Sequence, residues 1–160
     1  MEAIGAERVW KVYLSGEIHT DWREVIARGL AAAGLPVSLS APVTDHGASD
    51  DCGVAILGEQ TSAFWKDTQG AKLNAIRTRT LIEEADVVVV RFGEKYRQWN
   101  AAFDAGFATA LSKPLIVVQP TEFDHALKEV DASALVAREP EQVIDLLRYV
   151  IRGELVGVNV

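Results

Sequence analysis

The sequence predicts an α/β protein built on a three-layer, flavodoxin-like or Rossmann-like doubly wound sheet of five parallel strands in the order 2-1-3-4-5. Short apolar runs alternate with segments whose apolar residues recur at helical spacing, which is the pattern of βαβ units. The run "DVVVVRF" at 86–92 is β-branched throughout its centre, as expected for a strand buried on both faces of a parallel sheet.

The other elements follow in chain order. The run "VWKVYLSG" at 9–16 is a short apolar strand that ends in Ser15-Gly16. The helix after it is capped by Thr20 or Asp21 and stops at Gly34. Further strands are expected at 35–42, 114–120 and, more weakly, 133–137, and further helices at 71–86, 99–111, 123–130 and 139–153.

The segment 41–69 shows little periodicity and is rich in Asp, Gly, Ser and Thr. A connection of this length is uncommon in a compact domain and often forms a binding loop or a lid. Phe64 and Trp65 in this segment suit a lid over a flat ligand. We therefore expect a long loop here that contributes to the functional site.

The composition limits the class of function. The 160 residues, 49% hydrophobic and 24% charged, predict one globular domain spanning 1–160. The net charge of −7 argues against a surface for nucleic acid or anionic membranes, because such a surface needs clustered Lys and Arg. A small anionic ligand held by backbone amides is still compatible with this charge.

The cysteine and histidine content predicts no internal disulfide and no metal centre. Cys52 is the single cysteine, and His19, His46 and His125 are too scattered for metal-ligand spacing. We expect no metal and no cofactor. The first ten residues lack the basic and apolar regions of a signal peptide, and no apolar run reaches the length of a membrane span, so we expect a cytoplasmic protein.

The expected sheet order also predicts where a ligand binds. Ligands of such sheets lie outside the carboxyl ends of the strands at the topological switch point, here between the first and third strands. The segments that meet there are 13–22, the loop 41–69 and 93–104. A pocket formed by these three segments is our expectation.

Asp104 is the one carboxylate in the first turns of a helix that is otherwise made of small and apolar residues. Asn100 lies one turn before it on the same side of the helix. In a pocket, Trp99, Phe103 and Phe107 would exclude water from Asp104 and raise its pKa. The alternative is a partly exposed helix acid paired with a nearby basic side chain.

Other residues at this edge have two possible interpretations. Tyr13 and the Ser15-Gly16 turn either bind a ligand or are a core tyrosine and a plain turn. Glu94 points either into the pocket or into solvent. His19 is either a proton shuttle or a solvated loop residue.

The quoted strands and their flanks resemble a known superfamily. The segments "VYLSG", "EEADVVVV" and "KPLIVV" resemble the nucleoside 2-deoxyribosyltransferase superfamily. More narrowly, "GEIHTDWR", "ILGEQ", "FGEKYRQWNAAFDAG" and "KPLI" resemble the bacterial YtoQ family, and this likeness covers about 13–148. The resemblance implies the same fold and pocket as the sheet order does.

The resemblance also implies roles for particular residues. Asp104 falls where the superfamily has its nucleophilic glutamate, and Tyr13 on the tyrosine that positions the nucleophile and the sugar. Gln98 falls where relatives have an Asp or Ser, and Thr78 where several transferases keep another acid. Asp104 is about 1.5 Å shorter than a glutamate, and a ~1 Å misplacement can cost ~10²-fold in rate. The neutral residues at 78 and 98 remove candidate proton donors for the leaving base.

Together these features predict an enzyme that acts on the N-glycosidic bond of a small-molecule nucleoside or nucleotide, by hydrolysis or (deoxy)ribosyl transfer. Asp104 and Tyr13 are the expected catalytic residues. The expected substrate-binding residues are Ser15, Gly16, Glu17, Trp22, Glu94, Gln98, Trp99 and Asn100. The competing hypothesis is a non-catalytic nucleotide-binding or sensor module that uses the same pocket.

The helix at 99–111 is apolar nearly all round, although one helix on a sheet buries a single stripe. A second apolar stripe needs another cover, and superfamily members commonly assemble with neighbouring subunits closing each other's pockets. We therefore expect a homodimer or a higher homo-oligomer. The alternative is that the terminal helix and the tail "GELVGVNV" of the same chain cover this face.

Overall fold

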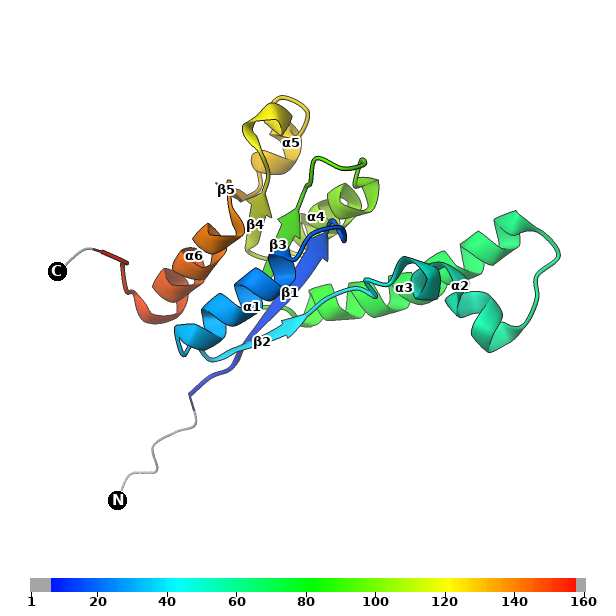
Figure 1. The fold of residues 1–160 in the computed structure, drawn as a ribbon, viewed down its shortest axis with the longest axis horizontal. Helices are drawn as coiled ribbons and strands as arrows, with labels where there is room; N and C mark the ends of the chain where they lie inside the picture. The colour runs from blue at the N-terminus through cyan, green and yellow to red at the C-terminus, as the bar shows by residue number, and fades with distance from the viewer. Residues whose placement is uncertain (1–6, 158–160) are drawn as a thin grey trace, which may run out of the picture.

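A computed structural model of the chain describes residues 7–157. Its centre is one sheet of five parallel strands in the order β2-β1-β3-β4-β5 (Figure 1). The strands are β1 (Trp10–Gly16), β2 (Val37–Ser40), β3 (Val87–Arg91), β4 (Leu115–Val118) and β5 (Leu135–Ala137). The fold class and the strand order predicted from the sequence are confirmed.

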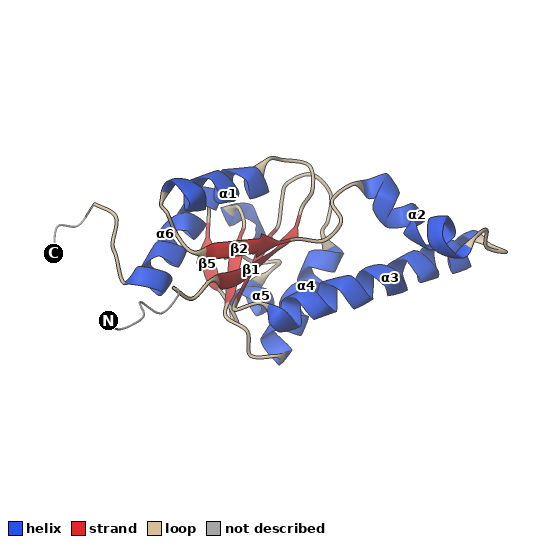
Figure 2. Ribbon diagram, turned by 90° about the horizontal axis from the view of Figure 1, so that it is seen from below, coloured by secondary structure: helices blue, strands red, loops and turns tan. Residues whose placement is uncertain are grey.

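Helices cover both faces of this sheet (Figure 2). One face carries α1 (Trp22–Ala32) and α6 (Pro140–Arg152), and the other carries the C-terminal part of α3 (Ala63–Glu84) together with α4 (Trp99–Ala110) and α5 (Lys128–Asp131). The short η1 (Thr121–Phe123) precedes α5. Within residues 7–157, no helix is both long and apolar enough to cross a lipid bilayer.

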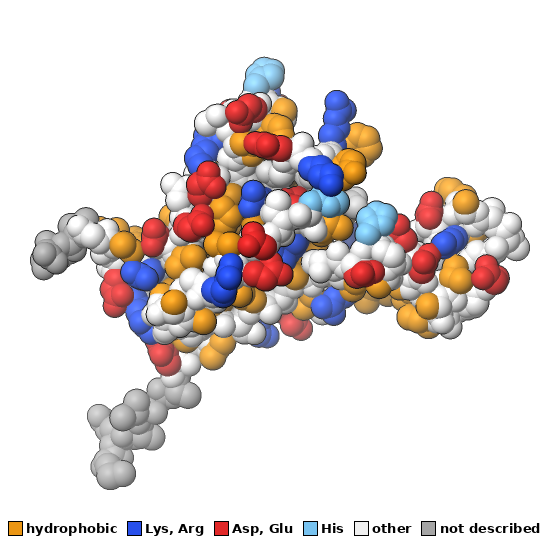
Figure 3. Space-filling model, in the orientation of Figure 1, with side chains coloured by type: hydrophobic (Ala, Val, Ile, Leu, Met, Phe, Trp, Pro, Cys, Tyr) orange, Lys and Arg blue, Asp and Glu red, His pale blue; other side chains and the backbone are white. Residues whose placement is uncertain are grey.

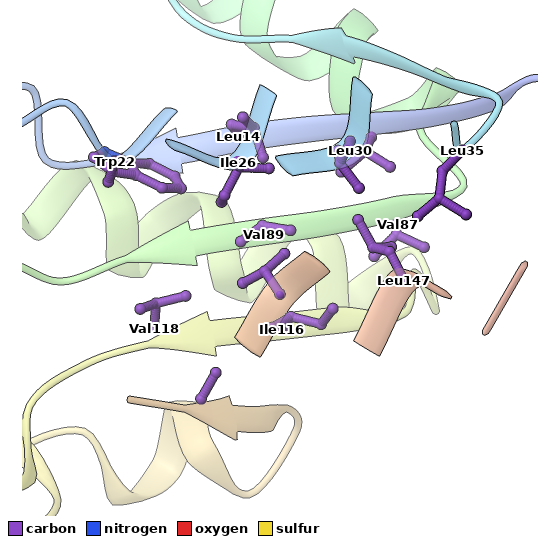
Figure 4. Packing of buried hydrophobic residues seen from close by; sticks show 13 residues of the cluster. Leu14, Trp22, Ile26, Leu30, Leu35, Val87, Val89, Ile116, Val118 and Leu147 are labelled. Atoms are coloured by element: carbon purple, nitrogen blue, oxygen red, sulfur yellow. The ribbon is translucent and has the colours of Figure 1, made fainter. Parts of the chain in front are cut away.

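The alternation of side chains along the strands divides the core into two layers. Val12 and Leu14 of β1 pack with Val89 of β3 under α1 and α6 (Figure 4). Tyr13 points to the opposite face, where it packs under α3 and α4 with Val88 and its neighbours. Because successive side chains of a strand point to opposite faces, Ser15 follows Tyr13 towards α4. The register of β1 therefore decides which polar groups meet that helix.

The segment predicted as a long loop is instead largely helical. It contains α2 (His46–Leu57), capped by the Asp45 side chain, which accepts a hydrogen bond from the Ala48 backbone N at 2.7 Å, and the beginning of α3. The two helices pack against each other and project beyond the sheet (Figures 1 and 2). Phe64 and Trp65 lie in the first turn of α3, and α3 begins at the end of the projection that is away from the sheet (Figure 1), so the expected lid over the site is wrong.

Candidate active site

The Ser15 hydroxyl and the Asp104 carboxylate join β1 to α4 at the carboxyl edge of the sheet. Ser15 Oγ donates a hydrogen bond to Asp104 Oδ2 at 2.5 Å. Ser15 is almost completely buried, and Asp104 is half-buried. The two residues are far apart in the sequence, and they meet because β1 and β3 are neighbours and α4 follows β3. The contact lies at the switch point where the sheet order predicted a site.

Tyr13 is the second polar group beside Asp104. Its side chain is fully buried, and its hydroxyl has no hydrogen-bond partner among the described residues. Burial raises the pKa of Tyr13, the negative charge of Asp104 raises it further, and the charges of Arg23 and Arg77 oppose this effect. The phenol therefore stays protonated at neutral pH and lies within electrostatic reach of Asp104.

Burial also raises the pKa of Asp104, while the hydrogen bond from Ser15 lowers it, and the net direction is upward. This is the direction predicted from the sequence. The predicted cause was partly wrong, because Trp99 and Phe103 are 73% and 62% exposed. Both lie on the solvent side of α4, whereas the sheet side of the helix is buried through small residues such as Ala105.

Glu17 is a buried carboxylate that braces the loop after β1. Its oxygens accept hydrogen bonds from the His19 backbone N at 2.7 Å and from the backbone N and the hydroxyl of Thr20. Arg91 Nε lies 3.6 Å from Glu17 Oε1. Although burial raises the pKa of Glu17, these hydrogen bonds and the Arg91 charge bring it below its usual range. The structure thus gives Glu17 a structural part, and its contact with a substrate stays a prediction.

Trp22 belongs to the core rather than to a ligand surface. It is 1% exposed, is the first residue of α1, points into the same core layer as Leu14 and Ile26 (Figure 4), and donates from Nε1 to the Glu17 carbonyl at 2.9 Å. The expected packing of Trp22 on a flat ligand face is therefore wrong. Sequence reasoning missed the next residue, Arg23, which donates to the Leu14, Gly16 and Glu17 carbonyls. An arginine in a first helical turn gave no signal of this role.

The loop between β3 and α4 is organised by Gln98. Its Oε1 accepts from the Gly93 backbone N at 3.0 Å, and its Nε2 donates to the Lys95 and Tyr96 carbonyls at 2.9 Å. These bonds hold Tyr96 at a φ of 68°, which is uncommon for a residue other than glycine. Gln98 therefore shapes this loop, and its expected contact with a substrate stays a prediction.

The remaining candidates are placed as follows. Glu94 and Asn100 are exposed, as is Trp99. The Thr78 hydroxyl donates to the Asn74 carbonyl of its own helix at 2.9 Å. The structure thus brings Tyr13, Ser15 and Asp104 together, whereas the other candidates lie on the surface, in the supporting loops or, for Trp22, in the core. Among residues 7–157, no group of three or more His, Cys, Asp or Glu side chains is arranged to hold a metal ion.

Comparisons with known proteins agree with this fold. Among solved structures, a conserved protein from Enterococcus faecalis V583 superposes with a TM-score of 0.58 at 12% identity, covering 86% of this chain and 96% of that one. A 2-deoxyribosyltransferase from Bacillus psychrosaccharolyticus gives a TM-score of 0.51 at 16% identity, covering 84% of this chain and 90% of the other. At these identities the likeness shows the fold alone.

Sequence comparison finds a relative of higher identity and a matching family model. The uncharacterized protein YtoQ of Bacillus subtilis (strain 168) is 42% identical over 144 residues, which cover 89% of this chain and 97% of that protein. The family model described as nucleoside 2-deoxyribosyltransferase YtoQ matches residues 13–151, which include the end of β1 from Tyr13, all of α4 and every site residue discussed above. The chain therefore belongs to the nucleoside 2-deoxyribosyltransferase YtoQ family.

Proposed function

We propose that this protein cleaves the N-glycosidic bond of a nucleoside or nucleotide, by hydrolysis or by (deoxy)ribosyl transfer, with Asp104 as the attacking carboxylate. One observation carries the proposal. A partly desolvated carboxylate is held by a buried serine hydroxyl at the switch point, beside a buried tyrosine hydroxyl that has no partner among the described residues. Membership of a family named for deoxyribosyl transfer supports the same class of bond.

In the proposed reaction each group has a part. Ser15 holds Asp104 Oδ2, which leaves Oδ1 to attack the anomeric carbon as the bond to the base breaks. The product of this step is a sugar ester of Asp104, which water or a second base then releases. Tyr13 keeps its proton, and its hydroxyl has no partner among the described residues, so it is available to donate a hydrogen bond to a sugar oxygen of a bound substrate. Burial of the site strengthens these interactions, because they act away from bulk water.

The test is a panel of nucleosides and nucleoside 5′-monophosphates, incubated with the protein and analysed for free base by chromatography. Each compound is offered with and without a second base as acceptor, so that hydrolysis and transfer are told apart. We expect free base from at least one compound. If the protein binds members of the panel and releases base from none, the non-catalytic binding module is the correct account.

Replacing Ser15 by alanine is expected to move the acid limb of the pH–rate profile to higher pH. A carboxylate nucleophile must be ionised, so the rate falls as the pH drops through the pKa of Asp104. Burial raises that pKa and the Ser15 hydrogen bond lowers it, so removing the hydroxyl raises it further. The measurement is kcat/KM from about pH 4 to pH 8, with Ser133→Ala at an exposed position as the control. A limb that stays in place or moves to lower pH contradicts this role of Ser15.

We also propose that the protein is a homodimer or a higher homo-oligomer. The solvent side of α4 exposes Trp99 and Phe103, and α6 cannot cover them because it packs with α1 on the opposite face of the sheet. The last three residues of the tail lie outside the described residues. Hydrophobic side chains also lie along the projecting α2–α3 pair (Figure 3). Those with more than half of their surface exposed are Ile56, Leu57, Phe64 and Ile76.

Sedimentation equilibrium at micromolar concentration tests the assembly. We expect a mass of at least twice 17.4 kDa for the wild type. Phe103→Arg is expected to lower this mass if α4 forms the contact, because it places a charge in the apolar patch. Since Phe103 is exposed in the single chain, the variant is expected to fold. If the wild type sediments as a single 17.4 kDa species, the proposed homo-oligomer is wrong.

A further inference from the structure

The two loops that border the candidate site touch each other through an aromatic pair. The His19 ring, on the loop after β1, and the Tyr96 ring, on the loop after β3, have centroids 5.0 Å apart and planes inclined by 54°. Both residues are exposed, and both loops follow the strands that form the switch point. The pair therefore lies at the edge of the sheet where a doubly wound fold binds its ligand.

Each ring is held in place by the residues that organise its loop. The His19 backbone N donates to the buried Glu17 carboxylate at 2.7 Å, which fixes the chain at that residue. Tyr96 keeps its uncommon positive φ of 68° while its carbonyl accepts a hydrogen bond from Gln98 at 2.9 Å. The Lys95 ammonium lies 5.5 Å from the centre of the Tyr96 ring. Residues of both loops thus fix the positions of the two rings.

Cleavage of an N-glycosidic bond needs an acid as well as a nucleophile. The departing base nitrogen takes the bonding electron pair, and proton donation to the base makes this step easier. Thr78 and Gln98 donate to backbone carbonyls and carry no acidic group. Glu17 has a lowered pKa and is therefore ionised, and the raised pKa of Tyr13 makes its phenol a weak acid.

An imidazole remains as a suitable donor at this edge. It is the side chain whose ordinary titration range lies closest to neutral pH, so it can both give and take a proton there. His19 lies on the loop that follows β1, the strand whose Ser15 holds Asp104. The Glu17 carboxylate accepts a hydrogen bond from the His19 backbone N, the Tyr96 ring packs against the His19 ring, and the Lys95 ammonium lies over the Tyr96 ring.

We propose that His19 is the general acid–base residue of the site, held against Tyr96 between the loops after β1 and β3, where it protonates the departing base. This inference rests on the proposed function. In the first step Asp104 forms the bond to the anomeric carbon, the carbon–nitrogen bond breaks, and protonated His19 gives its proton to the base. In the second step neutral His19 takes a proton from water as the water oxygen bonds to the anomeric carbon and the ester bond to Asp104 breaks. The net reaction consumes one water and restores both residues.

The experiment compares two substrates with the same sugar. One is the nucleoside that the wild type cleaves most rapidly, and the other is the p-nitrophenyl glycoside of that sugar, whose leaving group departs without being protonated. His19→Gln is expected to lose about 10²–10³-fold in kcat on the nucleoside, which is the usual contribution of general acid catalysis. The loss on the p-nitrophenyl glycoside is expected to be less than about 5-fold, because that bond breaks without an acid.

Further variants separate chemistry from structure. His125→Gln changes another exposed histidine and is expected to behave as the wild type on both substrates. Tyr96→Phe keeps the ring contact and should retain activity, whereas Tyr96→Ala should share part of the selective loss. Equal losses of His19→Gln on both substrates, or no loss on the nucleoside, overturn the role of His19. A wild type that cleaves neither a nucleoside nor a nucleotide overturns the proposed function itself, and this failure is recognisable because it appears before any variant is made.

Discussion

Asp104→Asn is expected to lower turnover by about 10⁴-fold, a loss comparable to removal of a central catalytic residue in other enzymes. Asparagine has nearly the same shape, and its side-chain oxygen still accepts the hydrogen bond from Ser15. It lacks the negative charge that attacks the anomeric carbon. Ligand affinity should therefore change little while kcat collapses. The measurements are steady-state kinetics and calorimetric titration with the same nucleoside.

Two comparisons make this result interpretable. Asp145→Asn, at an exposed position on α6 and on the opposite face of the sheet, should leave turnover unchanged. The Asp104 variant should also be at least as stable as the wild type at neutral pH. Burial raises the pKa of Asp104, so its ionisation in the folded protein weakens stability as the pH rises through that value. If Asp104→Asn keeps most of the wild-type turnover, Asp104 is not the nucleophile.

Gly16→Ala is expected to destabilise the protein by about 2–5 kcal/mol, the sum of backbone strain and overpacking. Gly16 has a φ of 114°, which L-residues other than glycine rarely adopt. A Cβ on it would lie 2.1 Å from the Arg91 carbonyl oxygen and 2.8 Å from the Arg91 backbone N. Relief of this clash requires β1 and β3 to separate at the switch point, beside Ser15. Urea unfolding monitored by tryptophan fluorescence measures the loss.

Gly106→Ala is the matched control, because a Cβ at this position in α4 meets no atom within 4 Å. Its free energy of unfolding is expected to be about 0.5–1 kcal/mol higher than that of the wild type, because alanine has a higher helix propensity than glycine. Neutral surface substitutions typically change the free energy of unfolding by less than about 0.5 kcal/mol. If the free energy of unfolding of Gly16→Ala differs from that of the wild type by no more than this, the packing described for β1 against β3 is incorrect.

The sheet was predictable because its strands are short and strongly apolar, as in "DVVVVRF" around Val87–Arg91. The helix at 71–86, which forms most of α3, was also predictable, whereas α2 and the beginning of α3 were not. These helices meet at two glycines, where a Cβ on Gly53 would lie 3.1 Å from the Gln69 Cβ, and one on Gly70 would lie 3.1 Å from the Asp50 carbonyl oxygen. A contact made through glycines leaves no hydrophobic stripe, so periodicity indicated a loop.

The site was predictable in location more than in detail. The switch-point rule brought Tyr13, Ser15 and Asp104 to one edge. It did not indicate that the serine, rather than the tyrosine, holds the carboxylate, because that depends on side-chain reach. It also did not distinguish Trp22 in the core from Trp99 on the surface, since both are tryptophans near the ends of helices at that edge. Burial of an aromatic follows from tertiary packing, which one sequence does not show.

Mass spectrometry of the trapped sugar ester tests the central claim most directly. Nucleosides with fluorine at the 2′ position of an arabinose ring are suitable probes, because the fluorine destabilises the positive charge that develops during release of the ester. The account predicts a mass increase of one fluorinated sugar, located on the peptide that contains Asp104 and absent from Asp104→Asn. An adduct on another residue, or none from a protein that cleaves the parent nucleoside, would contradict it.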